Sequence, residues 1–302
     1  LQSVFIGYTI MLNRRFLRLK ALQSIYAYCQ SESISLTQAE RQLLQGVDAL
    51  YKLFIYQLSF WVEIKQFAER RIEENKNKHF PTEADLNPNM KFVNNRILNV
   101  LEKNNHLLRL EEQYKINWAD SREDFIRNLY TKLTETEEYH DYMNNGKDSF
   151  SDDKRFLVTI IETYMAENGL LYDYYSDRDL DFNSDYQLAV YLLWRFIGEL
   201  PADFDANSSL PSAFKSEVED KTFVIKLFEK TILHHDEYME MVNATVSNWD
   251  YERLALMDKI LIFMALTEFI EFHSIPVKVT INEYIEISKL FSTPESRRFI
   301  NG

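Results

Sequence analysis

Apolar residues recur every three or four positions along most of the chain, a spacing that predicts α-helices. One helical pattern runs from Arg14 to Cys29, and a longer one from about Leu36 to Asn75. Further helical stretches are expected at 91–112, 122–142, 154–175 and 185–199. The chain has 302 residues but only 6 Gly and 6 Pro, which favours helices over strands and turns. We therefore predict an all-α fold of antiparallel helical bundles.

Polar segments suggest how the helices are divided. Residues 201–211 are rich in Asp, Asn and Ser and form the best candidate linker. We predict a C-terminal helical domain at 213–302 and an extended N-terminal helical region with a long insertion at 11–212. Residues 1–10 precede Met11, which resembles a natural start, and we interpret them as a leader.

Two segments of the chain resemble each other. The sequence DKRF at 153–156 resembles DKTF at 220–223, and Glu162 and Glu229 follow at the same offset. One hypothesis is a duplicated helical unit. The alternative is that two amphipathic helices resemble each other by chance, and two units are too few for a solenoid.

Composition limits the functions that the chain can have. The formal net charge is -13, so the overall field does not attract nucleic acid, and an RNA role needs a local basic patch. No apolar run approaches the roughly 20 residues that span a bilayer, so we expect no membrane segment. A single cysteine, Cys29, rules out an internal disulfide and most cysteine-based zinc sites. A reducing cytoplasm fits this composition, and we predict a cytoplasmic protein.

The last 55 residues carry strong helix signals. Asn248 is a candidate helix cap, and Leu254, Met257, Leu261 and Met264 form one apolar stripe after it. Residues 280–283 read as a capping box, in which Thr280 would accept from the backbone and Glu283 would reach back.

Three motifs in this segment resemble the NusB family. They are NWDYERLALMDK at 248–259, IPVKVTINE at 275–283, which is similar to the family's IPxKVAINE, and SRRFING at 296–302, which is similar to its SxKFVNG ending. The resemblance covers roughly residues 215–302. A weaker match, RRFLRLKALQSIY at 14–26, resembles the family's arginine-rich first helix.

The resemblance implies a function and partners. NusB proteins are helical transcription antitermination factors that bind the boxA RNA element together with the ribosomal protein NusE. We therefore expect boxA-like RNA, NusE and the RNA polymerase elongation complex as partners, with no cofactor. The implied process is control of elongation and termination on ribosomal RNA operons.

The candidate RNA-binding residues come from both ends of the chain. On a helix, Arg14, Arg15 and Arg18 share one arc, and guanidinium groups bind phosphates and stack on bases. The alternative is that they are ordinary solvated charges. The family motifs add three further positions, Asp258, Glu295 and Phe299. For these the alternatives are two surface charges and a core aromatic.

Two positions depart from the family pattern. Phe263 stands where the family's long helix usually carries a basic residue, and Phe16 replaces a residue that is often basic. Both departures remove a possible phosphate contact.

The sequence lacks the usual signals of an enzyme. It has no Gly-rich phosphate loop, nucleophile elbow or cysteine pair. One Glu-x-x-His occurs at 137–140, but a di-iron bundle needs a second such motif. We predict a non-enzymatic protein and keep two hypotheses. The first is an RNA-binding antitermination factor, and the second is a helical module that binds NusE or polymerase-associated proteins with little RNA contact.

Overall fold

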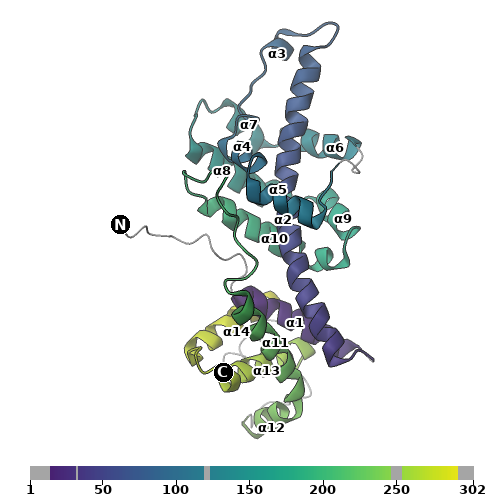
Figure 1. The fold of residues 1–302 in the computed structure, drawn as a ribbon, viewed down its shortest axis with the longest axis vertical. Helices are drawn as coiled ribbons and strands as arrows, with labels where there is room; N and C mark the ends of the chain where they lie inside the picture. Colours follow the sequence, from purple (N-terminus) through teal and green to yellow (C-terminus); the bar gives the residue numbers. More distant parts are fainter. Residues whose placement is uncertain (1–13, 32, 119–122, 246–253, 292–302) are drawn as a thin grey trace, which may run out of the picture. The chain divides into compact units, whose positions relative to one another are not determined.

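The computed structural model describes residues 14–31, 33–118, 123–245 and 254–291. Every regular element in these ranges is a helix (Figure 1), which confirms the all-α prediction. None of these helices is long and apolar enough to cross a membrane. The interpretation of residues 1–10 as a leader falls outside the described ranges.

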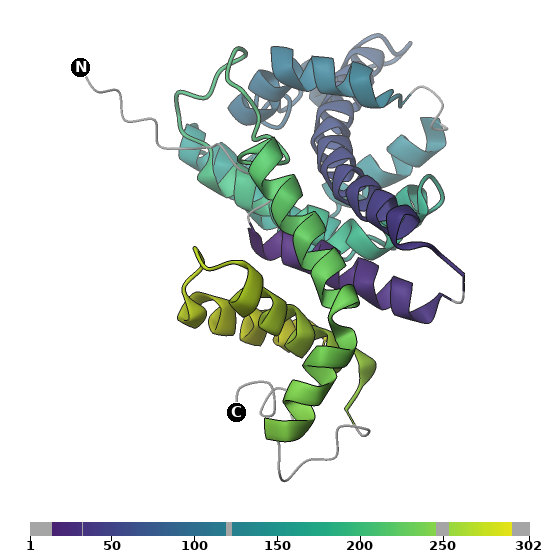
Figure 2. The same ribbon diagram turned by 60° about the horizontal axis from the view of Figure 1, so that its bottom comes forward.

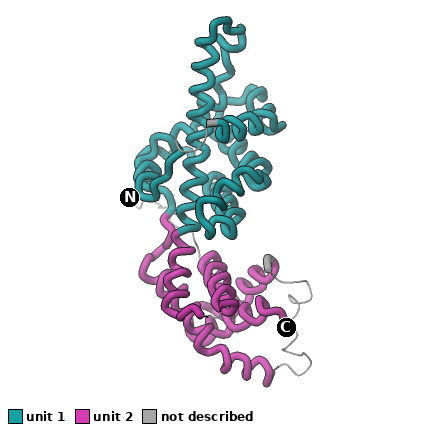
Figure 3. Tube along the Cα trace, turned by 90° about the vertical axis from the view of Figure 1, so that its right-hand side faces the viewer, with its two compact units in different colours: residues 1–9, 49–211 teal, residues 10–48, 212–302 magenta. Residues whose placement is uncertain are grey.

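The chain divides into two compact units (Figure 3). Unit 1 comprises residues 1–9 and 49–211, and unit 2 comprises residues 10–48 and 212–302. The first helix therefore groups with the C-terminal helices, whereas the sequence analysis placed it in an N-terminal region at 11–212. The physical reason is that α1 (Arg14–Gln30) packs on α11 (Glu217–Leu233) and α13 (Leu256–Glu271), a long-range contact that periodicity does not reveal.

Unit 1 is organised around α2 (Leu36–Lys76), a helix of 41 residues that begins in unit 2 (Figure 1). Its aromatic residues bury against other helices of the unit: Phe54 meets Phe196 edge to face at 5.7 Å, and Tyr56 meets Tyr175 at 5.4 Å. The remaining elements of this unit are α3 (Glu83–Leu86), α4 (Arg96–Glu102), α5 (Asn105–Tyr114), α6 (Glu123–Thr134), α7 (Glu137–Asn144), α8 (Phe150–Ile160), the π-helix η1 (Ile161–Met165), α9 (Gly169–Ser176) and α10 (Leu180–Glu199).

Unit 2 contains α1, the start of α2, and α11 to α14 (Figure 2). Helix α12 (His235–Thr245) covers one side of α13 through a small core of Tyr238, Val242 and Phe263. Helix α14 (Val277–Phe291) packs along α13. Helices α1, α11, α12 and α14 all pack on α13.

The predicted capping box at 280–283 is wrong. Helix α14 begins at Val277, so Thr280 lies inside the helix and is fully buried. Its hydroxyl donates to Glu268 on α13 at 2.7 Å instead of accepting from the backbone. A capping box and a buried hydroxyl give the same sequence pattern, and only the neighbouring helix distinguishes them. The predicted cap at Asn248 lies outside the described residues.

The two segments that resemble each other also have equivalent structures. Helix α8 is capped by Ser149 and α11 by Ser216, each accepting from a backbone N–H three residues on. Phe156 and Phe223 are both buried at the same distance from these caps. Beyond these positions the first segment continues with η1, α9 and α10, and the second with α12 and α13. The shared caps and buried positions fit a duplicated unit, and periodic burial is also what two unrelated amphipathic helices show.

The correspondence continues into the last helix of each segment. Six of the nine buried positions of α10 have the same spacing as six of the seven buried positions of α13. The pairs are Ala189 and Ile260, Val190 and Leu261, Leu192 and Phe263, Leu193 and Met264, Phe196 and Thr267, and Ile197 and Glu268.

Candidate nucleic-acid interface

The candidate interface lies in unit 2 at the start of α1. Arg14 and Arg15 are the first two residues of this helix, and no acidic residue occupies its first turn. Cations at a helix N-terminus oppose the helix dipole, so this placement needs compensation from elsewhere. The compensation comes from two carboxylates, Glu268 on α13 and Glu283 on α14.

Arg18 is held inside unit 2 by Glu268. Its Nε and Nη2 atoms donate to the two carboxylate oxygens at 2.7 and 2.6 Å, and the side chains are 3% and 0% exposed. The hydroxyls of Thr280 and Tyr284 donate to the same carboxylate at 2.7 and 3.3 Å. Each oxygen of Glu268 therefore has two donors, which satisfies a charge that would otherwise be costly to bury.

The cluster shifts the pKa values of its members. Burial alone lowers the pKa of Arg18, but the hydrogen bond and charge of Glu268 outweigh it and raise the pKa overall. Burial raises the pKa of Tyr284 well above its ordinary value, and the charge of Glu268 adds to this effect. Both groups thus keep their ordinary protonation states at neutral pH.

Arg15 forms a second, more exposed pair. Its Nε and Nη2 atoms donate to the two oxygens of Glu283 at 2.8 and 2.7 Å, with side chains 43% and 18% exposed. The hydrogen bond from Arg15 lowers the pKa of Glu283, so this carboxylate is ionised at neutral pH. Arg18 Nη1 lies 3.6 Å from the same carboxylate, which links the two pairs.

Arg14 contacts an aromatic ring. Its guanidinium carbon lies 5.0 Å from the centre of the Phe223 ring on α11, and that of Arg18 lies 5.5 Å from it. Cation–π contacts of this kind contribute about 0.5–1 kcal/mol at exposed sites. Phe223 is buried, so it fixes the start of α1 on α11 while Arg14 stays partly exposed.

The structure separates the six predicted site residues into three groups. Arg14 and Arg15 lie together at the surface end of α1. Arg18 and Asp258 are buried, at 3% and 2% exposure, unlike the surface arc that the prediction assumed. Arg18 faces inward because its arc borders the apolar stripe, and Asp258 sits in the first turn of α13. Glu295 and Phe299 lie outside the described residues.

The two family departures are core residues. Phe263 is 2% exposed and packs with Tyr238 and Val242 beneath α12. Phe16 is 5% exposed. Neither side chain offers a charged group to RNA, and both positions serve apolar packing instead of phosphate binding.

The sequence analysis did not identify Glu268 and Glu283 as the partners of the arginines. Glu268 had a signal, because it interrupts a run of apolar residues on a helix whose neighbouring positions are buried. A carboxylate at such a position requires a cationic partner. The partner, Arg18, is 250 residues away in sequence, so only the fold identifies it.

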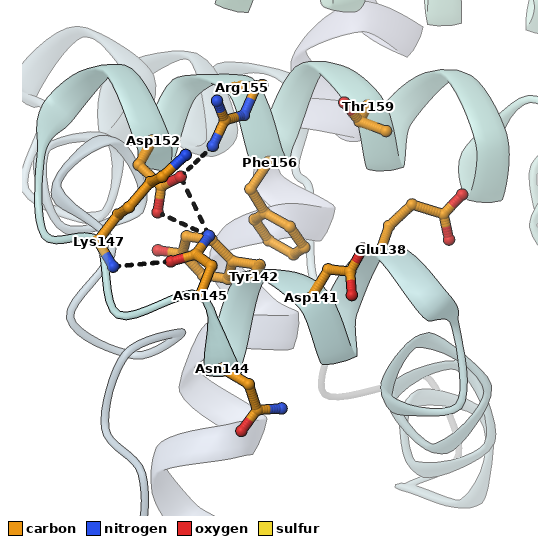
Figure 4. A pocket seen from close by; sticks show the side chains of 10 residues that line it. All are labelled: Glu138, Asp141, Tyr142, Asn144, Asn145, Lys147, Asp152, Arg155, Phe156 and Thr159. Atoms are coloured by element: carbon orange, nitrogen blue, oxygen red, sulfur yellow. Dashed lines mark hydrogen bonds and ion pairs between the residues drawn. The ribbon is translucent and has the colours of Figure 1, made fainter.

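A surface pocket of unit 1 between α7 and α8 has a structural explanation. Figure 4 shows Asn145 and Arg155 directed at the buried Asp152. Asp152 also accepts from Lys91 at 2.9 Å, and Phe156 stacks on Tyr142 at 4.1 Å beside it. The carboxylate is saturated by the unit's own donors. Among the described residues no cluster of His, Cys, Asp and Glu could hold a metal ion.

Comparisons with known proteins concern the C-terminal part of the chain. A profile described as the NusB family matches residues 197–302. No solved structure matches the chain.

Several proteins named transcription antitermination protein NusB share this region. That of Salinibacter ruber is 35% identical over 104 residues, which is 33% of this chain and 65% of the relative. That of Chloroherpeton thalassium is 32% identical over 97 residues, which is 32% of this chain and 46% of the relative. That of Thermodesulfovibrio yellowstonii is 39% identical over 82 residues, which is 27% of this chain and 54% of the relative. The chain spans less than two thirds of each of these NusB proteins.

The arginine cluster lies outside the matched NusB region in sequence but contacts it in space. Arg15 and Arg18 bind Glu283 and Glu268, which both belong to residues 197–302. Most of the NusB region and α1 form one compact unit, with unit 1 inserted between them in the sequence.

Proposed function

We propose that unit 2 binds boxA-like single-stranded RNA together with NusE. In this role the protein is a transcription antitermination factor of the RNA polymerase elongation complex on ribosomal RNA operons. The observation that carries the proposal is the position of Arg14 and Arg15, which form the surface end of a helix docked on the NusB region. Glu295 and Phe299 remain in the proposed RNA site because the family motifs place them there.

The buried position of Arg18 and Asp258 narrows the proposal. Arg18 is bound to Glu268 and Asp258 is 2% exposed, so we propose that neither side chain contacts RNA directly. Direct phosphate contact falls to Arg14 and Arg15. A site with two such contacts gives a modest salt dependence, because each neutralised phosphate on a single strand adds about -0.7 to the slope of log K against log salt.

A second function, a protein-interaction module, is favoured by a different observation. Val277 and Ile281 lie one turn apart on α14 and are 57% and 42% exposed. Ile270 on α13 is 41% exposed. Exposed apolar residues at one-turn spacing suit a helix face that docks on a protein. NusE is the partner that we propose for this face.

RNA binding with and without NusE, measured across a salt series on the full chain, tests the proposal. An Arg14→Ala/Arg15→Ala variant should bind more weakly and show a shallower salt slope. Arg41→Ala, which removes an exposed charge on α2, is the matched control and should bind as the wild type does. Unchanged RNA binding in the double variant rejects the role of Arg14 and Arg15. RNA binding that is absent even with NusE rejects the RNA function and favours the interaction module.

The interaction module has its own measurement. A Val277→Ser/Ile281→Ser variant should lose NusE binding and keep RNA binding by Arg14 and Arg15. Retained NusE affinity in this variant would exclude the α14 face as the docking surface.

A further inference from the structure

Arg15 holds Glu283 with the same edge of its guanidinium that a phosphate would use. The Nε and Nη2 atoms face both carboxylate oxygens at 2.8 and 2.7 Å. This parallel two-bond geometry is also how arginine binds a phosphate. A carboxylate and an RNA phosphate cannot occupy this edge of Arg15 at the same time.

We propose that Glu283 is an internal competitor for the RNA phosphate at Arg15, an inference that rests on the proposed RNA-binding function. In the free protein Glu283 closes this edge of Arg15. When RNA binds, a phosphate oxygen pair replaces the two carboxylate oxygens. Glu283 therefore raises the concentration of anionic ligand at which Arg15 becomes occupied.

Exposure determines which of the two arginine pairs can exchange. The Arg15–Glu283 pair is 43% and 18% exposed, so water and ligand reach it. The Arg18–Glu268 pair is 3% and 0% exposed, and breaking it would leave a buried carboxylate without a cation. The exchange is thus confined to Arg15, and Arg18 keeps its partner.

Arg18 also lowers the free-energy cost of the exchange. Its Nη1 atom lies 3.6 Å from the Oε2 atom of Glu283. A Glu283 carboxylate that leaves Arg15 therefore still faces a cation. Without this second partner, displacement would leave a half-buried carboxylate uncompensated.

The competition favours chains of phosphates over single anions. An inorganic phosphate ion must displace Glu283 with one contact, whereas a strand can contact Arg14 and Arg15 together. Since the two residues are adjacent on α1, the contact with Arg14 raises the local concentration of phosphate at Arg15. We expect inorganic phosphate at millimolar concentration to compete poorly with RNA.

The test compares two substitutions of equal charge on the same helix. Glu283→Gln removes the competing charge and keeps the side-chain size, whereas Glu286→Gln removes a charge from an exposed residue that pairs with Lys289. The probe is a fluorescent boxA-like single-stranded RNA of about 12 nucleotides, within the span that single-strand sites cover, with NusE present. Glu283→Gln should tighten binding by roughly two- to fivefold, the range that exposed ion pairs span. Glu286→Gln should change it by much less.

A third variant identifies Arg15 as the group released. In an Arg15→Ala background, Glu283→Gln should give no gain, because no guanidinium edge remains to be opened. Three outcomes would overturn the competitor role. They are an equal gain in affinity from Glu286→Gln, a gain from Glu283→Gln that persists without Arg15, and weaker RNA binding by Glu283→Gln. Melting temperatures of all variants should agree within a few degrees, which excludes misfolding as the cause.

The outcomes also separate this inference from the proposed function. If Arg14→Ala/Arg15→Ala weakens RNA binding but Glu283→Gln does not strengthen it, only the competitor role fails. If the wild type binds no RNA with NusE, both fail.

Discussion

The last helices of the two corresponding segments bury the same positions with different chemistry. Unit 1 has Phe196 and Ile197 where unit 2 has Thr267 and Glu268. In unit 2 the Thr267 hydroxyl meets that of Thr231 at 2.9 Å, and Glu268 binds Arg18. In unit 1 Phe196 packs on Phe54. The apolar version shows that this helical arrangement does not require a buried ion pair.

This difference between α10 and α13 raises the question of what Glu268 contributes to unit 2. Apolar residues of similar volume often stabilise a core as well as a buried ion pair does. The Arg18–Glu268 pair joins α1 to α13 one turn from Arg14 and Arg15. Unit 1 uses aromatic packing at the equivalent positions.

Charge separates the two regions as well. Residues 49–211 contain 19 Lys and Arg against 29 Asp and Glu, whereas residues 10–48 and 212–302 contain 15 against 18. Most of the acidic excess thus lies in unit 1. Unit 1 therefore offers RNA no net attraction, and the proposed RNA binding depends on the local arginines of unit 2.

The largest expected effect comes from breaking the buried pair. Arg18→Ala leaves Glu268 buried without its cation and should destabilise unit 2 by about 3–5 kcal/mol. Hydrogen exchange of the α13 and α14 amides measures this loss within the full chain. Arg41→Ala is the exposed control and should change little. The comparison with unit 1 also predicts that Arg18→Met/Glu268→Leu recovers most of the loss, and failure to recover would show that unit 2 needs the ion pair.

A smaller effect is expected at the buried aspartates of the two segments. Asp153 accepts from Tyr142 Oη at 2.7 Å and from Arg96 Nη1 at 2.8 Å. Asp153→Ala leaves these donors unsatisfied and should cost about 1–3 kcal/mol. Asp220 accepts only the backbone N–H groups of residues 215 and 216 among its described partners, so Asp220→Ala should cost less. Urea unfolding of both variants decides the order, and a larger loss at Asp220 would contradict it.

The helix caps should behave alike in the two units. Ser149 and Ser216 each accept a backbone N–H three residues on, so each Ser→Ala substitution should cost about 1 kcal/mol. Glycine at either position should cost only a few tenths of a kcal/mol. Exchange rates of the amides of Asp152 and Glu219 report the two caps separately. A large difference between the units would argue against equivalent segments.

The smallest expected effect is the part of the pH dependence of stability that Glu283 contributes. Arg15 lowers the pKa of Glu283, so this pair stabilises the fold fully above the ordinary Glu pKa of about 4.3. The stabilisation disappears as pH falls through the lower pKa of the folded state, and it should not exceed about 1 kcal/mol. Glu283→Gln should lack this component when unfolding of the two proteins is compared between about pH 3 and 6. Parallel curves would show that the pair does not contribute.

Helix content was largely predictable because it depends on local spacing. The apolar period placed α1 and α2 within a few residues of their observed ends. The motifs at 248–302 indicated the similarity to the NusB family, which the match over residues 197–302 supports. The boundaries of the compact units were less accessible, because α1 joins α11 and α13 across the whole of unit 1.

The candidate site was predictable only in part. Sequence placed Arg14, Arg15 and Arg18 on one arc of a helix but could not show how deeply each is buried. The boundary between surface and core runs through that arc, between Arg15 and Arg18. Thr280 was misread for the same reason, because its hydroxyl suits a helix cap and a buried carboxylate equally well.

The sequence by itself determined the helices, the similarity of the C-terminal region to the NusB family and the presence of a basic helix start. These follow from local periodicity and from motifs contained in short segments. Only the tertiary structure decided that Arg18 is a core residue and that Glu283 occupies one edge of the Arg15 guanidinium. The reason is that burial and charge pairing depend on residues about 250 positions away, whose approach no local pattern encodes.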